Sequence, residues 1–81
     1  MFTVLFFAAA RDIAGPEMKI DDSIPLGNLP PLLIQMHPAL ETILTSCAVC
    51  VNLEYYDITE DATFVIKKGD EVGIIPPVSS G

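Results

Sequence analysis

The stretch KGDEVGIIPPVSSG, residues 68–81, decides how the rest of the sequence is interpreted. A polar turn at residues 67–70 precedes a short apolar segment at residues 71–75, which is typical of a β-strand. Two prolines stiffen the exit from this strand, and only small residues follow them. We therefore expect a folded domain over residues 1–75 and an extended, flexible C-terminal tail over residues 76–81.

The N-terminal part of the chain predicts two strands joined by a short helical turn. Residues 2–8 are aromatic and β-branched without strict alternation, which favours a central strand covered on both faces. Residues 9–15 combine helix formers with a glycine stop. Residues 17–21 alternate apolar and polar side chains, so we expect an antiparallel partner strand with Met18 and Ile20 facing the core.

One amphipathic helix is predicted over residues 23–36, because four apolar residues share a helical face: Leu29, Leu32, Leu33 and Met36. The prolines at positions 30 and 31 are tolerated only in its first turn. His37 precedes a proline that ends the helix, and residues 40–44 add a further turn. We interpret the histidine as a partly exposed helix cap and not as a catalytic group.

The second half of the chain predicts a strand at residues 47–52, a tight excursion at residues 53–57, a short segment at residues 63–66 and the strand at residues 71–75. Two strands, one helix and then further strands favour a mixed sheet of four to five strands curled around one main helix. The right-handed crossover makes the last strand parallel to the first. The predicted fold class is therefore α+β, of the β-grasp (ubiquitin-like) type.

Composition excludes several classes of protein. The 81 residues suffice for one domain, and the net charge of −7 disfavours binding to nucleic acid or to anionic membranes. No apolar run approaches the roughly 18 residues of a membrane span. Cys47 and Cys50 lie three apart in a predicted strand, where they face opposite sides, so we expect two reduced cysteines and a cytoplasmic protein.

The sequence offers no catalytic or metal-binding constellation, such as a Ser/His/Asp set or a phosphate-binding glycine loop. The distinctive group that remains is the carboxylate of Gly81. Adenylation by ATP would convert it into a mixed anhydride, which a persulfide could turn into a thiocarboxylate. Small neighbouring residues would leave that carboxylate accessible in a narrow tunnel.

Two blocks carry a family resemblance over essentially the whole chain. The block VLFFAAARDIAG, residues 4–15, and the block KGDEVGIIPPV, residues 68–78, followed by small residues and Gly81, resemble the small subunit of molybdopterin synthase. This family is the MoaD-like and ThiS-like group of ubiquitin-like sulfur carriers.

The resemblance implies a sulfur donor without a catalytic activity of its own. Gly81 is expected to become a glycyl adenylate and then a 1-thioglycine, through an E1-like, MoeB-like enzyme that uses the ATP. The carrier itself is expected to bind no cofactor and no metal. The large, MoaE-like catalytic subunit, in a heterotetramer, would then convert precursor Z (cyclic pyranopterin monophosphate) to molybdopterin. The residues implied to bind these partners are Phe7, Arg11, Ile75, Pro76, Pro77, Val78, Ser79 and Ser80.

Several alternatives stay open at the level of sequence. Phe7 and Ile75 fit core packing as well as a docking face, and Arg11 could anchor the first turn or contact a partner. The family's pattern ends in two glycines, whereas Ser80 precedes Gly81 here, which predicts slower adenylation. Rival functions are a sulfur carrier for thiamine or tRNA thiolation, a protein modifier joined to lysines, and a passive interaction domain.

Overall fold

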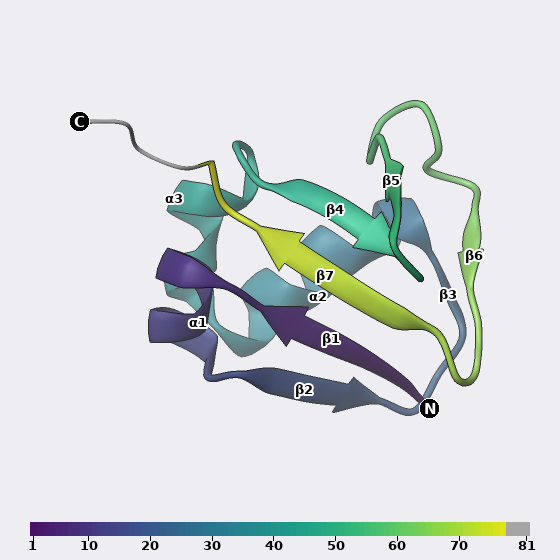
Figure 1. Ribbon diagram of the computed structural model, residues 1–81, viewed down its shortest axis with the longest axis horizontal. Coiled ribbons are helices and arrows are strands. Elements are labelled where there is room, and N and C mark those ends of the chain that lie inside the picture. The colour runs from purple at the N-terminus through teal and green to yellow at the C-terminus, as the bar shows by residue number, and fades with distance from the viewer. Residues whose placement is uncertain (78–81) are drawn as a thin grey trace.

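A computed structural model describes residues 1–77 of the chain (Figure 1). Its elements follow in order: β1 Phe2–Phe6, α1 Ala8–Ala14, β2 Glu17–Ile20, β3 Ile24–Pro25, the 3-10 turn η1 Leu26–Asn28, α2 Leu29–Met36, η2 Pro38–Leu40, α3 Glu41–Leu44, β4 Ala48–Val51, β5 Glu54–Tyr56, β6 Val65–Ile66 and β7 Glu71–Ile75. The predictions for Val78, Ser79, Ser80 and Gly81 lie outside the described residues.

The main sheet is mixed and has five strands in the order β2-β1-β7-β4-β5. Strand β7 lies at its centre, parallel to β1 and antiparallel to β4, while β2 and β5 form the edges. The parallel pairing of the first and last strands and the antiparallel pairing of β1 with β2 confirm the sequence prediction. A second, two-stranded sheet of β3 and β6 lies at one end.

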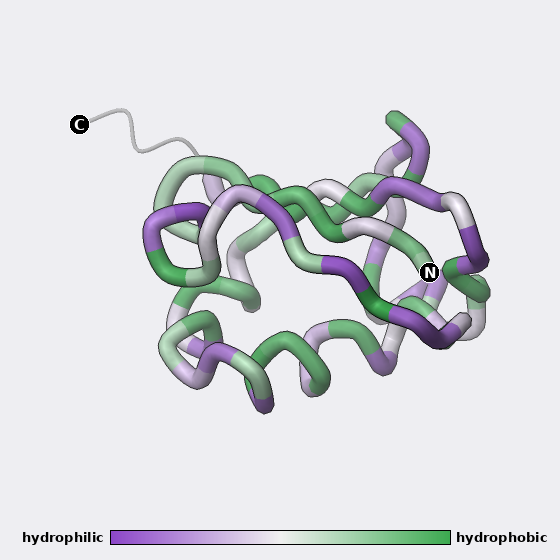
Figure 2. Tube along the Cα trace, turned by 90° about the horizontal axis from the view of Figure 1, so that it is seen from below, coloured by the Kyte–Doolittle hydropathy of each residue, from purple (hydrophilic) through white to green (hydrophobic). Residues whose placement is uncertain are grey.

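The helices cover only one face of the main sheet, as Figure 2 shows. Burial along β1 therefore alternates: Phe2, Val4 and Phe6 are buried, whereas the intervening side chains are partly exposed. The prediction that this strand is covered on both faces is wrong. An apolar run in the sequence does not show that the helices pack against only one side of the sheet. The side chains of Leu29 and Leu33 fill the space between α2 and the sheet.

The main helix begins later than the sequence indicated. Residues 23–36 were expected to be helical, but α2 begins at Leu29, with Pro30 and Pro31 in its first turn as predicted. Upstream, the backbone turns aside because the Leu26 N–H donates to the Phe64 carbonyl at 2.7 Å and β3 pairs with β6. The helical face is also narrower than predicted, since Met36 is 51% exposed.

Strand β5 is, besides β3, an element that the sequence prediction missed. Glu54–Tyr56 pairs with β4 through a two-residue turn made by Asn52 and Leu53, instead of forming an irregular excursion. Both turn residues have positive φ, 49° and 71°, as a type I′ hairpin requires. Leucine is an uncommon residue in that conformation, so the turn carried no recognisable signal. None of the helices within residues 1–77 has the length and apolar character of a membrane span.

Candidate functional site

The uncovered side of the sheet, which we call the open face, carries apolar side chains in its middle, where a solvated sheet usually has polar ones. Alternation places Leu5, Cys50 and Gly73 on this side, between buried neighbours on each strand. Strand register aligns Leu5 with Gly73, Gly73 with Cys50, and Cys50 with Tyr55. One row across four strands therefore forms the middle of the open face.

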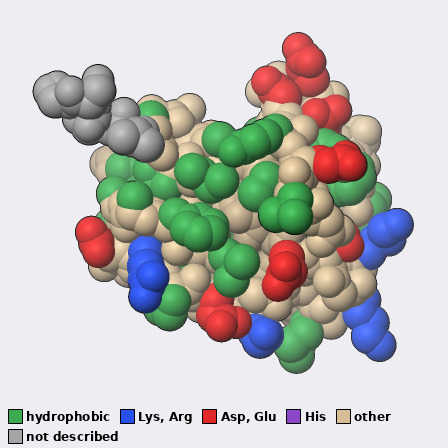
Figure 3. Space-filling model, in the orientation of Figure 1, with side chains coloured by type: hydrophobic (Ala, Val, Ile, Leu, Met, Phe, Trp, Pro, Cys, Tyr) green, Lys and Arg blue, Asp and Glu red, His purple; other side chains and the backbone are tan. Residues whose placement is uncertain are grey.

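Large exposed apolar residues extend this row. Phe7 is 46% exposed, Tyr55 72% and Leu53 94%. Figure 3 shows apolar side chains gathered over the middle of the sheet on this side of the molecule, with acidic side chains around them. Large apolar patches with a polar rim are typical of interaction sites, so we take this patch as the candidate site.

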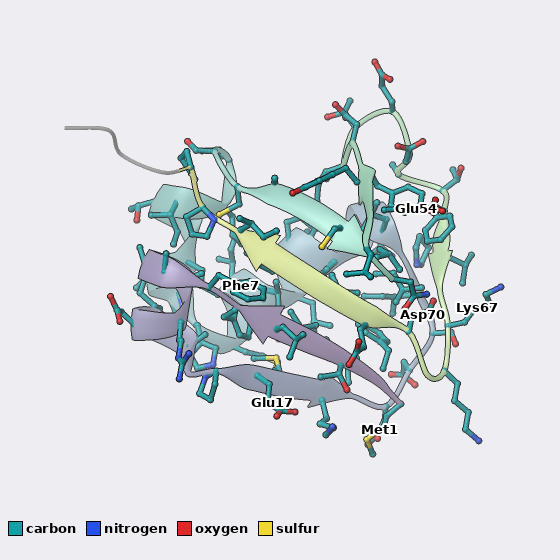
Figure 4. The ribbon with its side chains drawn as sticks, in the orientation of Figure 1. Met1, Phe7, Glu17, Glu54, Lys67 and Asp70 are labelled. Atoms are coloured by element: carbon teal, nitrogen blue, oxygen red, sulfur yellow. The ribbon has the colours of Figure 1, made fainter. Side chains whose placement is uncertain are left out.

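The positions of Phe7 and Ile75 answer the question that the sequence left open. Phe7 follows β1, and its N–H donates to the Ile74 carbonyl at 3.2 Å, while its ring lies over the sheet away from the helices (Figure 4). Ile75 is half-buried at the end of β7 and borders the same face. Neither residue belongs to the buried core, so both are available at the surface. Their role in docking stays a prediction.

The chain leaves the sheet beside the open face. Strand β7 ends at Ile75, the last residue before the predicted tail of residues 76–81. Pro76 is buried and Pro77 is exposed, so the accessible chain starts one residue later than the strand end. The predicted terminal site, Gly81, lies outside the described residues. The point where the chain leaves the sheet is fixed by Ile75, which pairs with Ala48 of β4.

Arg11 lies in the last turn of α1. Its carbonyl accepts the Gly15 N–H at 2.8 Å, and that glycine has φ 85°, which closes the helix and turns the chain toward β2. Among residues 1–77, the structure gives the exposed guanidinium no hydrogen bond or ion pair. The backbone of Arg11 thus anchors the turn, and its side chain remains available for a partner.

At one end of the open face, Asp70 and Asn52 form a hydrogen-bonded cluster, which we call the polar bracket. The sequence analysis did not predict it. The Asp70 carboxylate accepts the Lys67 N–H at 2.8 Å and the Asn52 side-chain amide at 3.0 Å. The first and then the second of these bonds hold the pKa of the Asp70 carboxyl below its ordinary value. Asn52 also accepts the Glu71 N–H at 3.0 Å, which fixes the turn that presents Leu53.

The two cysteines are free and lie in different surroundings. The Cys47 thiol donates to the Ile43 carbonyl at 3.2 Å, and burial raises the pKa of this thiol, which opposes thiolate chemistry. Cys50 lies on the open face. No three His, Cys, Asp or Glu side chains among residues 1–77 are grouped as metal ligands would be.

Among residues 1–77, two hollows of the surface bear on the candidate site. The larger, of about 570 Å³, lies between the helices and the β4–β5 side, where its lining includes Pro30, Leu44 and Ile58. The smaller, of about 220 Å³, lies on the open face and includes Ile75. We take the smaller one as part of the candidate site, because it adjoins both the apolar row and the point where the tail leaves the sheet.

The pattern of residues 4–81 matches the ThiS family. The chain belongs to this family. The match spans both blocks that carried the resemblance and reaches Gly81. Membership of the ThiS family confirms the family prediction made from the sequence.

Individual relatives agree with this assignment. The chain is 45% identical to a molybdopterin synthase sulfur carrier subunit from Pyrenophora tritici-repentis, over 99% of this chain and 89% of the relative. Among solved structures, it is similar to the small archaeal modifier protein 1 from Methanosarcina acetivorans, with 26% identity, a TM-score of 0.81, and coverage of 99% and 95%. It is also similar to a chain of the complex of subunits 1 and 2 of the molybdopterin-converting factor from Helicobacter pylori, with 26% identity, a TM-score of 0.72, and coverage of 99% and 97%. These likenesses confirm the β-grasp fold.

Proposed function

We propose that this chain is the sulfur carrier subunit of a molybdopterin synthase and donates sulfur from a thiocarboxylate on Gly81. The observation that carries the proposal is the family match, which continues through the tail to Gly81, together with near-complete coverage by relatives that bear this name. The open apolar face beside the tail exit supplies the docking surface that a carrier needs.

The chemistry requires little from the carrier beyond an accessible carboxylate. The Gly81 carboxylate attacks the α-phosphate of ATP, pyrophosphate leaves, and a glycyl adenylate forms on an E1-like, MoeB-like enzyme. A persulfide sulfur of that enzyme then attacks the acyl carbon, a C–S bond forms and AMP leaves. Attack of a second enzyme thiol on the S–S bond releases the thiocarboxylate and leaves an enzyme disulfide. The carrier holds no nucleotide of its own and presents its tail in the cytoplasm.

The large catalytic subunit is the second partner in this proposal. The tail, from Pro77 to Gly81, enters its active site, where the sulfur is transferred to precursor Z. The open face docks against the outside of that subunit and places the tail. The net charge of −7 favours partner surfaces that are basic around an apolar centre.

The test is intact mass spectrometry after incubation with ATP, a sulfur source and the E1-like enzyme. We expect exchange of one oxygen for sulfur, localised by fragmentation to Gly81. A variant that lacks Gly81 serves as the matched control and must stay unchanged. Unchanged mass of the native chain, under conditions that modify a carrier ending in two glycines, would contradict the proposal.

Ser80 provides a quantitative check on the same reaction. Its Cβ and hydroxyl restrict the backbone next to the reacting carboxylate, where the family pattern has glycine. We expect Ser80→Gly to accelerate ATP/pyrophosphate exchange. An equal rate would show that the serine imposes no cost on activation.

A protein modifier is the second candidate, because the chain is structurally similar to a small archaeal modifier protein. A modifier uses the same activated glycine but transfers it to lysine amines. Antibody detection of covalent conjugates in cells, lost when Gly81 is deleted, would favour this function over sulfur transfer.

A further inference from the structure

Gly73 occupies the centre of the open face without contributing a side chain. It lies in the middle of β7, the central strand, with Leu5 and Cys50 as its register partners. A glycine inside a strand weakens it and often marks close approach of another chain. Gly73 is not among the residues with positive φ, unlike Gly15 and Gly69, so the backbone at position 73 does not require glycine. The reason for glycine is therefore space.

That space is bounded by neighbouring side chains of the open face. A Cβ at position 73 would lie 2.7 Å from the Cys50 Sγ and 3.5 Å from the Phe7 Cε2. At this point the open face has a hollow of about 220 Å³. The apolar lining consists of Leu5, Phe7, Cys50, Leu53, Tyr55 and Ile75. The volume is below the range of about 300–1,000 Å³ usual for small-molecule sites, and it suits one bulky side chain.

We propose that this hollow, the Gly73 hollow, receives one apolar side chain of the molybdopterin synthase large subunit, beside a Lys or Arg that faces Glu71. This inference rests on the proposed function and deepens it. Glu71 is the one acidic residue in the lining, and its side chain is exposed. A desolvated apolar anchor in a central pocket, next to a charged rim, is the arrangement that dominates binding energy in protein interfaces.

The position of the hollow points to a partner that accepts the tail. Of the two such partners in the proposed function, we choose the large subunit, because a structurally similar chain is found in a complex of subunits 1 and 2 of a molybdopterin-converting factor. Ile75 both lines the hollow and ends the strand that leads into the tail. The tail from Pro77 to Gly81 spans at most about 18 Å when extended, so a protein that accepts it lies close to the open face and its hollow. A second copy of this chain is a poorer occupant, because two molecules of net charge −7 repel each other.

The test measures binding to the large subunit encoded in the same genome, by titration calorimetry. Gly73→Ala pushes against Cys50 and fills the floor of the hollow, while Cys50→Leu fills it from β4 without altering a strand glycine. We expect each variant to bind about tenfold more weakly. The double variant Gly73→Ala/Cys50→Ala removes the sulfur that the new methyl group meets, so it should bind within about twofold of the native chain.

Val65→Ala is the matched control, because Val65 is a 45% exposed apolar residue on β6, in the other sheet, and its truncation should leave the affinity unchanged. Thermal unfolding of each variant separates lost binding from lost folding. Native affinity in both folded filling variants would overturn the inference and leave the proposed function intact. A native chain that neither binds the large subunit nor acquires sulfur would overturn both. A dimer of the carrier alone that Gly73→Ala dissociates would assign the hollow to a second copy and overturn the inference.

Discussion

The two faces of the main sheet are built from the same strands but serve different purposes. The covered face holds the buried side chains of β1, β4 and β7, packed against α2. The open face is also apolar, yet Phe7, Leu53 and Tyr55 are left exposed to solvent. Burial explains apolar residues on the first face. On the second face they stabilise little in the isolated chain, which fits the docking surface that we propose.

Two adjacent residues, Phe6 and Phe7, test this contrast, because the first is buried in the core and the second is exposed on the open face. Phe6 is 2% exposed and lies in the core, so Phe6→Ala removes a buried ring and leaves a cavity. We expect the free energy of unfolding to fall by about 3–5 kcal/mol, measured by urea denaturation. In a domain of this size, that loss is a large share of the total stability. A loss below about 1 kcal/mol would show that the core has been misassigned.

Phe7→Ala should leave the stability nearly unchanged and weaken binding. The ring is 46% exposed, so we expect stability to change by less than about 1 kcal/mol. Binding to the large subunit should weaken by at least about tenfold, because an aromatic anchor of the docking surface is lost. With Phe6 intact, titration calorimetry measures the affinity of this variant, and its unfolding measures the stability. Unchanged affinity would remove Phe7 from the proposed docking surface.

The same contrast explains what the sequence could predict. Strand β7 and the buried pair Leu29 and Leu33 were predicted because short apolar runs and helical spacing are local signals. The face on which Phe7 lies was not predictable, because it depends on which side of the sheet the helices cover. The Gly73 hollow was hidden for the same reason, since it requires the register of β7 against Cys50.

Leu53 presents its side chain on the open face from a strained backbone conformation. It is 94% exposed and has φ 71°, a conformation that glycine adopts without penalty and leucine does not. We expect Leu53→Gly to be about 1 kcal/mol more stable than Leu53→Ala, the reverse of the usual order. Both variants should bind the large subunit more weakly than the native chain. Equal stability of the two variants in thermal unfolding would argue against strain at this turn.

The smallest expected effect concerns the bracket that fixes this turn. Hydrogen bonds from Lys67 N–H and the Asn52 amide stabilise the charged form of Asp70 and lower its pKa relative to the unfolded chain. A depressed carboxyl pKa contributes stability above the unfolded value of about 4, and the contribution disappears as the pH falls through the folded pKa. Asp70→Asn should therefore be less stable than the native chain at pH 7, by less than about 1 kcal/mol, and the difference should shrink below pH 4. Urea midpoints of both proteins at pH 7, 4 and 3 measure this difference. A constant difference would mean that the bracket acts through geometry alone, whereas a shrinking one would show that charge on Asp70 helps to hold Leu53 over the open face.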